Sequence, residues 1–352
     1  MHKDKAPRFP AIIQHGWNVL PHVLVDAYNE ELKDEDGFLG DRASKGAFRD
    51  ILERWRKEVA SKGEDPFGDT PTYSLTKSHL DKYLGGDDPI AGALIHTAVE
   101  EFAGELTLVT ERFLKLDEWK DTEHIVVGGG LSGSHIGKLA IGRTLIILRD
   151  KGIDIEMSSI TNHPDEAGLM GALELAPSWI LDGHDAIIAA DIGGTNLRVG
   201  VIELKMKKGD ITKAGVWKSL LWRHKDDDPG RDEAVVRIAE MIEKLVKQAH
   251  DEKLRVAPLI AIGCPGIITR DGTIEKGAQN LPGDWEDHDF SLSRELAQQL
   301  PLINGHEPLF VIHNDAVVQG LSEAVNMQDV KHWGVFTIGT GLGNARFTNR
   351  AR

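Results

Sequence analysis

The sequence predicts a layered α/β protein with two domains, on the strength of three observations. The chain has 352 residues, roughly twice the length of a common single domain. Hydrophobic residues make up 41% of it, which is enough to fill two cores. From Pro89 onward, short apolar runs alternate with longer amphipathic segments, as is typical of strands that alternate with helices.

Residues 1 to about 90 are polar and irregular and carry the fewest signals. Helices are predicted over residues 21–31 and 47–61. The following portion has a clearer pattern, in which a helix from Pro164 leads toward the first of two glycine-rich hairpins. The elements predicted there are helices over residues 89–114, 136–149 and 164–175 and strands over residues 124–127 and 153–159.

The first hairpin places an acid and two glycines between two apolar runs, over residues 186–202. Glycines allow positive φ and bring backbone N–H groups close to a phosphate, while an acid at a strand end can hold a hydrated divalent metal. The hairpin therefore predicts an anion site with a metal beside it. Its candidate residues are Asp191, Gly193, Gly194, Thr195 and Asn196.

A second acid follows another apolar strand, over residues 309–313. In an open α/β sheet the carboxyl ends of strands face the ligand, so Asp315 is a candidate general base and Asn314 a candidate hydrogen-bonding partner of a hydroxyl. The alternative interpretation is that Asp315 is a helix N-cap.

The loop over residues 263–285 contains a glycine-proline turn and then an amide, a carboxylate and an indole. Gly266, Asn280, Asp284 and Trp285 together suit a polyhydroxylated ligand. The alternative is a surface loop with a packed tryptophan.

Two further glycine turns follow apolar strands. Residues 339–343 are a second candidate phosphate turn, through Gly339, Thr340, Gly341 and Gly343, and Gly128, Gly129 and Gly130 suit a flat ligand such as adenine or ribose. With Gly133, the latter turn also satisfies G-x-G-x-x-G, and Asp154 lies 21 residues further on. A Rossmann dinucleotide-binding oxidoreductase is thus an alternative, although it leaves the two acid-bearing strand ends without a role.

Composition narrows the classes of partner. The formal net charge of −15 opposes binding to nucleic acids and anionic membranes. A single cysteine, Cys264, excludes a disulfide framework and a cysteine-rich zinc site, and no run approaches the ~18 apolar residues of a membrane span. We therefore expect a cytoplasmic protein that has no structural zinc.

Together these motifs resemble those of the ROK family of repressors and sugar kinases. The resemblance is specific from about residue 184 to residue 349 and fainter from about residue 98 to residue 176. It is carried by residues 191–200, Gly263-x-Pro265-Gly266, Asn280-Leu281-Pro282 with Trp285, Asn314-Asp315-Ala316 with Glu323, residues 339–343, Gly128-Gly129-Gly130 and residues 166–172.

The motif order is inverted relative to that family, since the adenosine turn precedes the first phosphate hairpin. The resemblance therefore implies a circularly permuted, two-lobed, actin-like ATPase fold of the ribonuclease H-like type. Its larger lobe would span residues 1–163, completed by residues 334–352, and its smaller lobe residues 164–333. Residues 8–14 are expected to supply a strand next to the one at residues 344–348.

The resemblance also implies the activity of a glucokinase-like enzyme that uses ATP and Mg²⁺ on a hexose. Asp191 would hold Mg²⁺ through water, Asp315 would be the general base, and the turns at Gly193-Gly194, Gly339–Gly343 and Gly128–Gly130 would bind ATP. Many members carry a Glu-Gly-x-His sugar contact and a zinc loop that are absent here, with His15, His22, Glu30, Glu31 and His79 as candidate replacements. A sugar-responsive transcriptional regulator is the second alternative, and a homodimer is compatible with either.

Overall fold

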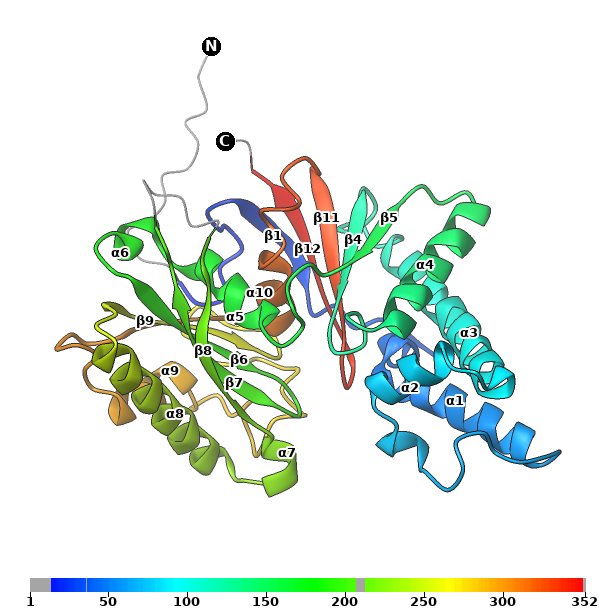
Figure 1. Cartoon of the computed structure of the whole chain (residues 1–352). Coiled ribbons are helices and arrows are strands. Elements are labelled where there is room, and N and C mark those ends of the chain that lie inside the picture. Colours follow the sequence, from blue (N-terminus) through cyan, green and yellow to red (C-terminus); the bar gives the residue numbers. More distant parts are fainter. Residues whose placement is uncertain (1–13, 36, 207–212, 351–352) are drawn as a thin grey trace, which may run out of the picture. The chain divides into compact units, whose positions relative to one another are not determined.

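The computed structural model describes residues 14–35, 37–206 and 213–350. Two compact units are present, each built from segments distant in the sequence, and we name them the Asp191 unit and the Gly129 unit (Figure 1). The sequence predicts residues 1–163 as part of one lobe, whereas the structure groups residues 14–25 with the other unit. Within the described residues, the Asp191 unit comprises residues 14–25, 166–206, 213–325 and 350, and the Gly129 unit comprises residues 26–35, 37–165 and 326–349.

The Asp191 unit contains a five-stranded mixed sheet in the order β10-β9-β6-β7-β8. Neighbours pair antiparallel among β6, β7 and β8 and parallel among β6, β9 and β10. All seven residues of β6 are buried, as expected for a central strand covered on both faces. The strands are β6 (Ala186–Ile192), β7 (Leu197–Glu203), β8 (Gly215–Trp222), β9 (Val256–Cys264) and β10 (Leu309–Asn314).

Different helices cover the two faces of this sheet. Val199 and Val201 of β7 share a core with the buried stripe of α8, which lies beside α9 (Figure 1). Gly200 points the other way, where a Cβ atom would lie 2.7 Å from Leu169 of α5. The α5 helix in turn packs against α10, so α5 and α10 form the layer nearest to the acidic strand ends. These helices are α5 (Ala167–Gly171), α8 (Arg231–Asp251), α9 (Leu292–Gln299) and α10 (Asp315–Leu321).

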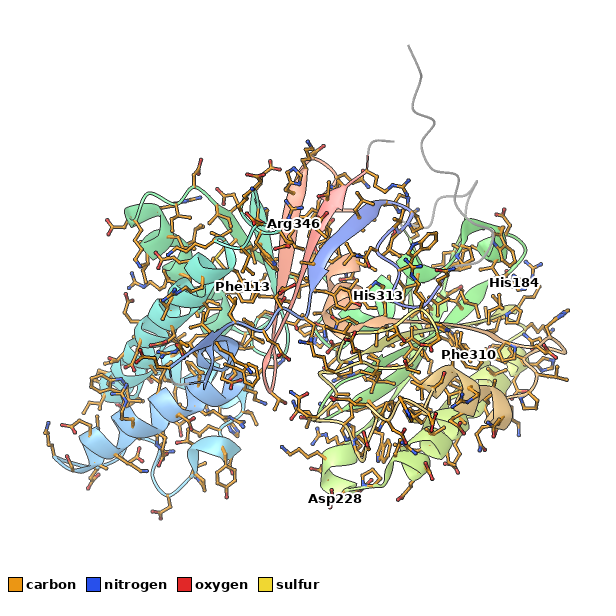
Figure 2. All side chains as sticks on the ribbon, turned by 180° about the vertical axis from the view of Figure 1, so that it is seen from behind. Phe113, His184, Asp228, Phe310, His313 and Arg346 are labelled. Atoms are coloured by element: carbon orange, nitrogen blue, oxygen red, sulfur yellow. The ribbon has the colours of Figure 1, made fainter. Side chains whose placement is uncertain are left out.

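The Gly129 unit contains a second five-stranded sheet, in the order β1-β12-β11-β4-β5. The β11 strand pairs antiparallel with β12 and parallel with β4, and β4 pairs parallel with β5. Phe113 (Figure 2) at the end of α3 meets Trp119 and Phe336 in an aromatic cluster of this core. The elements are β1 (Val23–Tyr28), α1 (Lys45–Ala60), α2 (Lys77–Leu84), α3 (Pro89–Phe113), β4 (His124–Gly128), α4 (His135–Asp150), β5 (Glu156–Ser159), β11 (His332–Ile338) and β12 (Leu342–Asn349).

The two sheets share one strand order when the second is counted from β11. Counting β6, β7, β8, β9 and β10 as strands one to five gives the spatial order 3-2-1-4-5. Counting β11, β12, β1, β4 and β5 in the same way gives the same spatial order. In this count, the first two strands of the Gly129 sheet come from the end of the chain and the other three from its beginning.

The helix predicted over residues 21–31 is wrong, because this segment forms β1. Its residues alternate between buried and half-buried, and β-branched Val23 and Val25 favour a strand. Asp26 accepts a hydrogen bond from Arg346, which lies on the neighbouring β12 and is labelled in Figure 2. The position next to β12 is thus taken by β1 rather than by residues 8–14, of which residues 8–13 lie outside the described part.

Most of the other predicted elements are confirmed within a few residues, with one change of type. The helix predicted over residues 164–175 is the short α5 followed by a 3-10 turn. Among the described residues, no helix is long and apolar enough to cross a membrane. The remaining short elements are β2 (Lys33–Asp34), β3 (Gly37–Phe38), η1 (Leu39–Ala43), η2 (Thr72–Ser74), η3 (Ala172–Leu175), α6 (Ser178–Leu181) and α7 (His224–Asp227).

Candidate active site

Two acids lie at the carboxyl ends of strands in the Asp191 unit. Strand pairing places Asp191 of β6 opposite Gly263 of β9, and the next residue of β9, Cys264, opposite Asn314 of β10. Asp315 follows directly as the first residue of α10. Burial and both carboxylates raise the pKa of the Cys264 thiol, which shows that both acids act on the same point. The two acids therefore lie at the same edge of this sheet.

Asp191 is held in a tight space. Its side chain is 7% exposed, and a Cβ atom at Gly168 of α5 would lie 2.4 Å from its carboxyl carbon and 2.6 Å from each oxygen. Real Cβ atoms do not approach so closely, so only glycine at position 168 leaves room for this carboxylate. Helix α5 thereby fixes where the charge of Asp191 lies.

Asp315 has the electrostatics of a general base. Its burial raises the pKa of the carboxyl to about 7, and the nearby Asp191 carboxylate adds to this rise. One carboxyl oxygen accepts a hydrogen bond from the backbone N–H of Ala316 at 2.9 Å. A base whose pKa lies near neutral pH is both available and strong enough to take a proton from a hydroxyl.

The helix N-cap at this site is Asn314 rather than Asp315. The Asn314 Oδ1 atom accepts hydrogen bonds from the N–H groups of Ala316 and Val317, at 3.0 and 3.2 Å. Its Nδ2 atom donates to the carbonyl of Gly266 at 3.0 Å, which ties α10 to the glycine-proline turn. Asn314 thus supplies the capping bonds that the alternative interpretation assigned to Asp315.

The hairpin that the sequence predicts to bind phosphate is closed by its own backbone and braced by a histidine side chain. Gly193 N–H donates to the carbonyl of Asn196 at 2.9 Å, and the carbonyl of Gly193 lies 2.7 Å from Nε2 of the buried His224. The N–H of Lys225 reaches the carbonyl of Thr195 at 3.4 Å. Sequence reasoning missed His224, because the residue lies 31 positions from its partner and no local motif marks it.

The reason for glycine in this hairpin differs from the one predicted. Neither Gly193 nor Gly194 has a positive φ. Instead, a Cβ atom at Gly194 would lie 2.7 Å from the Cβ of Asn280, so glycine permits close contact between the hairpin and the 280–285 loop. Asn280 is exposed, which leaves its amide accessible beside this hairpin.

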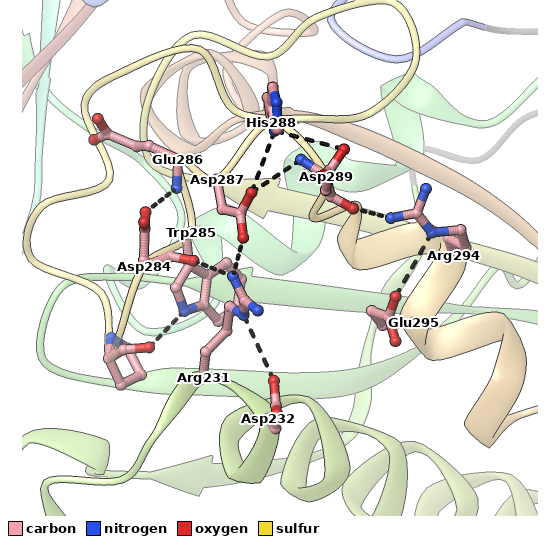
Figure 3. A network of polar contacts seen from close by, with 11 residues as sticks. Arg231, Asp232, Asp284, Trp285, Glu286, Asp287, His288, Asp289, Arg294 and Glu295 are labelled. Carbon is pink, nitrogen blue, oxygen red and sulfur yellow. Dashed lines mark hydrogen bonds and ion pairs between the residues drawn. The ribbon is translucent and has the colours of Figure 1, made fainter.

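Trp285 is a packed residue, as the alternative interpretation held. It is 1% exposed, and its indole N–H donates to the carbonyl of Pro282 at 2.7 Å. Figure 3 shows Arg231 from the start of α8 bonded to the Asp284 carbonyl at 2.6 Å and to the Asp287 carboxylate at 3.3 Å. These contacts fix the loop that carries Asn280.

The Gly129 unit brings its own two glycine turns together. Pairing of Thr337 with Gly128 places the ends of β11 and β4 side by side. Gly129 has φ +87°, and a Cβ atom there would lie 2.2 Å from the carbonyl oxygen of Ile338. Gly339 then closes the other turn by donating to the carbonyl of Gly341 at 2.9 Å. The predicted adenosine and second phosphate turns are thus adjacent.

The structure does not favour a Rossmann site. The glycine turn follows the carboxyl end of β4, whereas exposed Asp154 precedes β5, which runs parallel to β4 with His124 opposite Glu156. Asp154 therefore lies at the opposite end of the sheet from Gly128–Gly130 and cannot contact the same ribose. A helix-turn-helix is not favoured either, since α1 ends at Ala60 and α2 begins only at Lys77.

Two of the candidate replacements for the sugar contacts, His15 and His22, have hydrogen-bond partners within the Asp191 unit. His15 Nδ1 accepts from the N–H of Ile312 at 3.2 Å, and His22 Nδ1 lies 2.6 Å from a Glu174 carboxyl oxygen. A residue that sequence reasoning missed is His313 (Figure 2), whose burial lowers its pKa to about 4. Neutral His313 accepts from the N–H of Asn314 at 2.8 Å, which helps to fix the end of β10.

Comparisons with known proteins point to one family. The model of the ROK family matches residues 187–351. A glucokinase of Thermotoga maritima is 29% identical over 163 residues, which cover 46% of this chain and 44% of that glucokinase. The chain thus aligns with less than half the length of this curated relative. The crystal structure of a ROK hexokinase from Thermus thermophilus matches at 22% identity over 37% of this chain and 35% of that chain, with a TM-score of 0.27.

Proposed function

We propose that this chain, whose residues 187–351 match the model of the ROK family, transfers a phosphoryl group from ATP to a hydroxyl of a hexose or hexose derivative. One observation carries the assignment of the base. Asp315 lies at a strand end beside Asp191, and its pKa of about 7 suits removal of a hydroxyl proton at neutral pH.

The other residues of the Asp191 unit have positioning roles in this proposal. Asn280 offers its exposed amide to the hexose, while the turn at Gly193 and Gly194 offers backbone N–H groups to the transferred phosphate. Asn314 and Gly266 act on the substrate indirectly, because their mutual hydrogen bond holds α10 and thereby Asp315. In the Gly129 unit, the turns at residues 128–130 and 339–343 would bind the nucleoside and the remaining phosphates. Phosphoryl transfer depends mainly on such alignment.

The acids of the Asp191 unit fit a divalent cation. Carboxylate oxygens are the ligands that Mg²⁺ prefers, and Asp191 presents one beside a second acid whose pKa it raises. Asp191 would hold the ion through water, and Mg²⁺ would neutralise the charge of the transferred phosphate.

A substrate screen tests the proposal directly. ADP release is measured with ATP and Mg²⁺ over hexoses, amino sugars and their derivatives, and the product is identified by NMR as a sugar phosphate. At least one hexose should give a turnover that requires both ATP and Mg²⁺. Absence of turnover with every sugar, from a folded protein, would contradict the proposal.

We expect kcat/KM to fall on the acid side with a midpoint near pH 7. The base acts when ionised, and kcat/KM reports the pKa of the free enzyme, so activity should be present above the pKa of Asp315 and lost as pH falls through it. The check is a pH profile from 5 to 9, supported by infrared difference spectra of the carboxyl band against Asp315→Asn. A profile that stays flat down to pH 5 while the protein remains folded would remove Asp315 from this role.

We also propose that the fold is a circular permutation of the two-lobed, actin-like arrangement. Support comes from the strand order shared by both sheets and from the N–H of Arg350, the last described residue, which lies 3.0 Å from the carbonyl of His22 in the first described segment. Moving chain ends costs little when the old ends are close and the new break is exposed.

A relinked chain tests this permutation. Arg352 is joined to Met1 through a short Gly-Ser linker, and new ends are made at the exposed turn of Asp182 and Gly183. This chain should fold with an unchanged circular dichroism spectrum and retain turnover within about tenfold. A matched control with its break inside β6, between Ile188 and Ala189, should not fold. If the relinked chain fails to fold, as the control does, the proposed permutation is rejected.

A further inference from the structure

Two basic residues, Lys45 and Lys77, contact the glycine turns of the Gly129 unit, and a third, Arg49, lies near Lys45. Sequence reasoning assigned them no role. The N–H of Lys45, the first residue of α1, donates to the carbonyl of Gly339 at 3.0 Å. Lys77, the first residue of α2, reaches the carbonyl of Gly130 with its Nζ atom at 3.4 Å. Arg49 lies one helical turn after Lys45, on the same side of α1.

The two glycine turns connect the residues that contact them. Gly339 follows Ile338, whose carbonyl occupies the space where a Cβ of Gly129 would lie, and Gly129 precedes Gly130. Lys45 thus contacts one glycine turn and Lys77 the other, and the two turns are in contact with each other. We call Lys45, Arg49 and Lys77 the cation cluster.

The cation cluster differs in its ion pairing from other basic residues of the Gly129 unit. Within the described part of the chain, none of its three members forms an ion pair, whereas nearby Arg42 and Arg56 pair with Asp34 and Asp65. Burial lowers the pKa of Lys45, and the charges of Arg49 and Lys77 lower it further. Arg49 and Lys77 thus both repel the charge of Lys45, in a chain whose formal net charge is −15. An anion bound among them would relieve this repulsion.

The arrangement suits an anion with several charges along a chain. A single carboxylate would leave two of the three cations uncompensated, whereas a linear phosphate chain carries a charge for each. The flexible stems of Lys45 and Lys77 can follow such a chain. We propose that the cation cluster binds the phosphate chain of the phosphoryl donor. This inference rests on the kinase function proposed above.

The experiment measures the affinity of the full chain, without sugar, for two ligands that contain a linear triphosphate, namely ATP and inorganic tripolyphosphate. The method is calorimetry. Lys45→Gln and Lys77→Gln are tested singly and together, with Lys82→Gln on the same helix α2 as a matched control. Adenosine, which lacks phosphate, reports whether the glycine turns remain intact.

We expect the double variant to lose about tenfold to a hundredfold in affinity for ATP, with a weaker dependence on salt. Adenosine binding should be unchanged, as should all affinities of Lys82→Gln, and Lys45→Arg with Lys77→Arg should restore most of the loss. An equal loss for tripolyphosphate supports a site for any phosphate chain, and a loss for ATP alone supports a site that needs the nucleoside as well.

Unchanged ATP affinity in the double variant, or an equal loss of adenosine binding, would overturn the inference. A separate assay of hexose phosphorylation keeps the two proposals apart. If the parent chain phosphorylates a hexose but the double variant binds ATP normally, the cation cluster is rejected and the kinase stands. If the double variant loses phosphate binding but no hexose is phosphorylated by the parent chain, the site stands and the kinase is rejected.

Discussion

Asp315→Asn is expected to lower kcat about a thousandfold, because the amide cannot accept the proton of the attacking hydroxyl. The change is nearly isosteric, and the oxygen that accepts the N–H of Ala316 is retained. The capping bonds of Asn314 are also untouched, so α10 should stay in place. Dissociation constants for ATP and hexose, measured by calorimetry, should therefore change little.

The same variant should be more stable than the parent chain at pH 8. The pKa of Asp315 is raised from 3.8 to about 7 in the folded protein, so folding favours the protonated form and stability falls as pH rises from about 4 to about 7. Asparagine removes this cost. A melting temperature that rises at pH 8 while turnover collapses would show that the carboxylate is retained for chemistry at the expense of stability.

Asp154→Asn is the matched control for this substitution. It replaces an exposed acid at the far end of the Gly129 sheet, so turnover and melting temperature should both stay at the parent value. The assignment of Asp315 is wrong if Asp315→Asn turns over at a near-normal rate. It is also weakened if Asp154→Asn lowers turnover equally, since the effect would then follow net charge rather than position.

The order of elements and the glycine turns were predictable from the sequence, because both depend on local signals. Apolar runs that end in an acid or a glycine marked β6 and β10 correctly. The 21–31 segment was misread because its apolar residues fit both a helix and a strand. Only pairing with β12, more than 300 residues away, selects the strand. Pairing between distant segments leaves no local trace.

The site residues that sequence reasoning missed act across long separations. His224 braces Gly193, His313 holds the backbone of Asn314, and Lys45 bonds Gly339. Each contact depends on a neighbouring element rather than on a motif. Gly168 shows the same limit, since the sequence does not reveal that its missing side chain makes room for Asp191.

Gly168→Ala is expected to displace the carboxylate of Asp191. Turnover should then fall about a hundredfold, and the Mg²⁺ concentration that gives half-maximal activity should rise. The added Cβ would lie within 2.6 Å of all three atoms of the carboxyl group, so either the carboxylate or α5 must shift. Misplacement of a positioning group by about 1 Å can cost this much in rate. The measurements are kcat and the Mg²⁺ concentration that gives half-maximal activity.

Gly104→Ala is the control, because it makes the same chemical change at an exposed position of α3 where no atom lies within 4 Å of the new Cβ. Alanine is the better helix former by about 1 kcal/mol, so this variant should keep full activity and melt at the same or a higher temperature. A Gly168→Ala variant with parental turnover and Mg²⁺ dependence would mean that the position of the Asp191 carboxylate is unimportant. An expected loss at Gly168 but not at Gly104 would instead tie activity to the space that α5 leaves for this one acid.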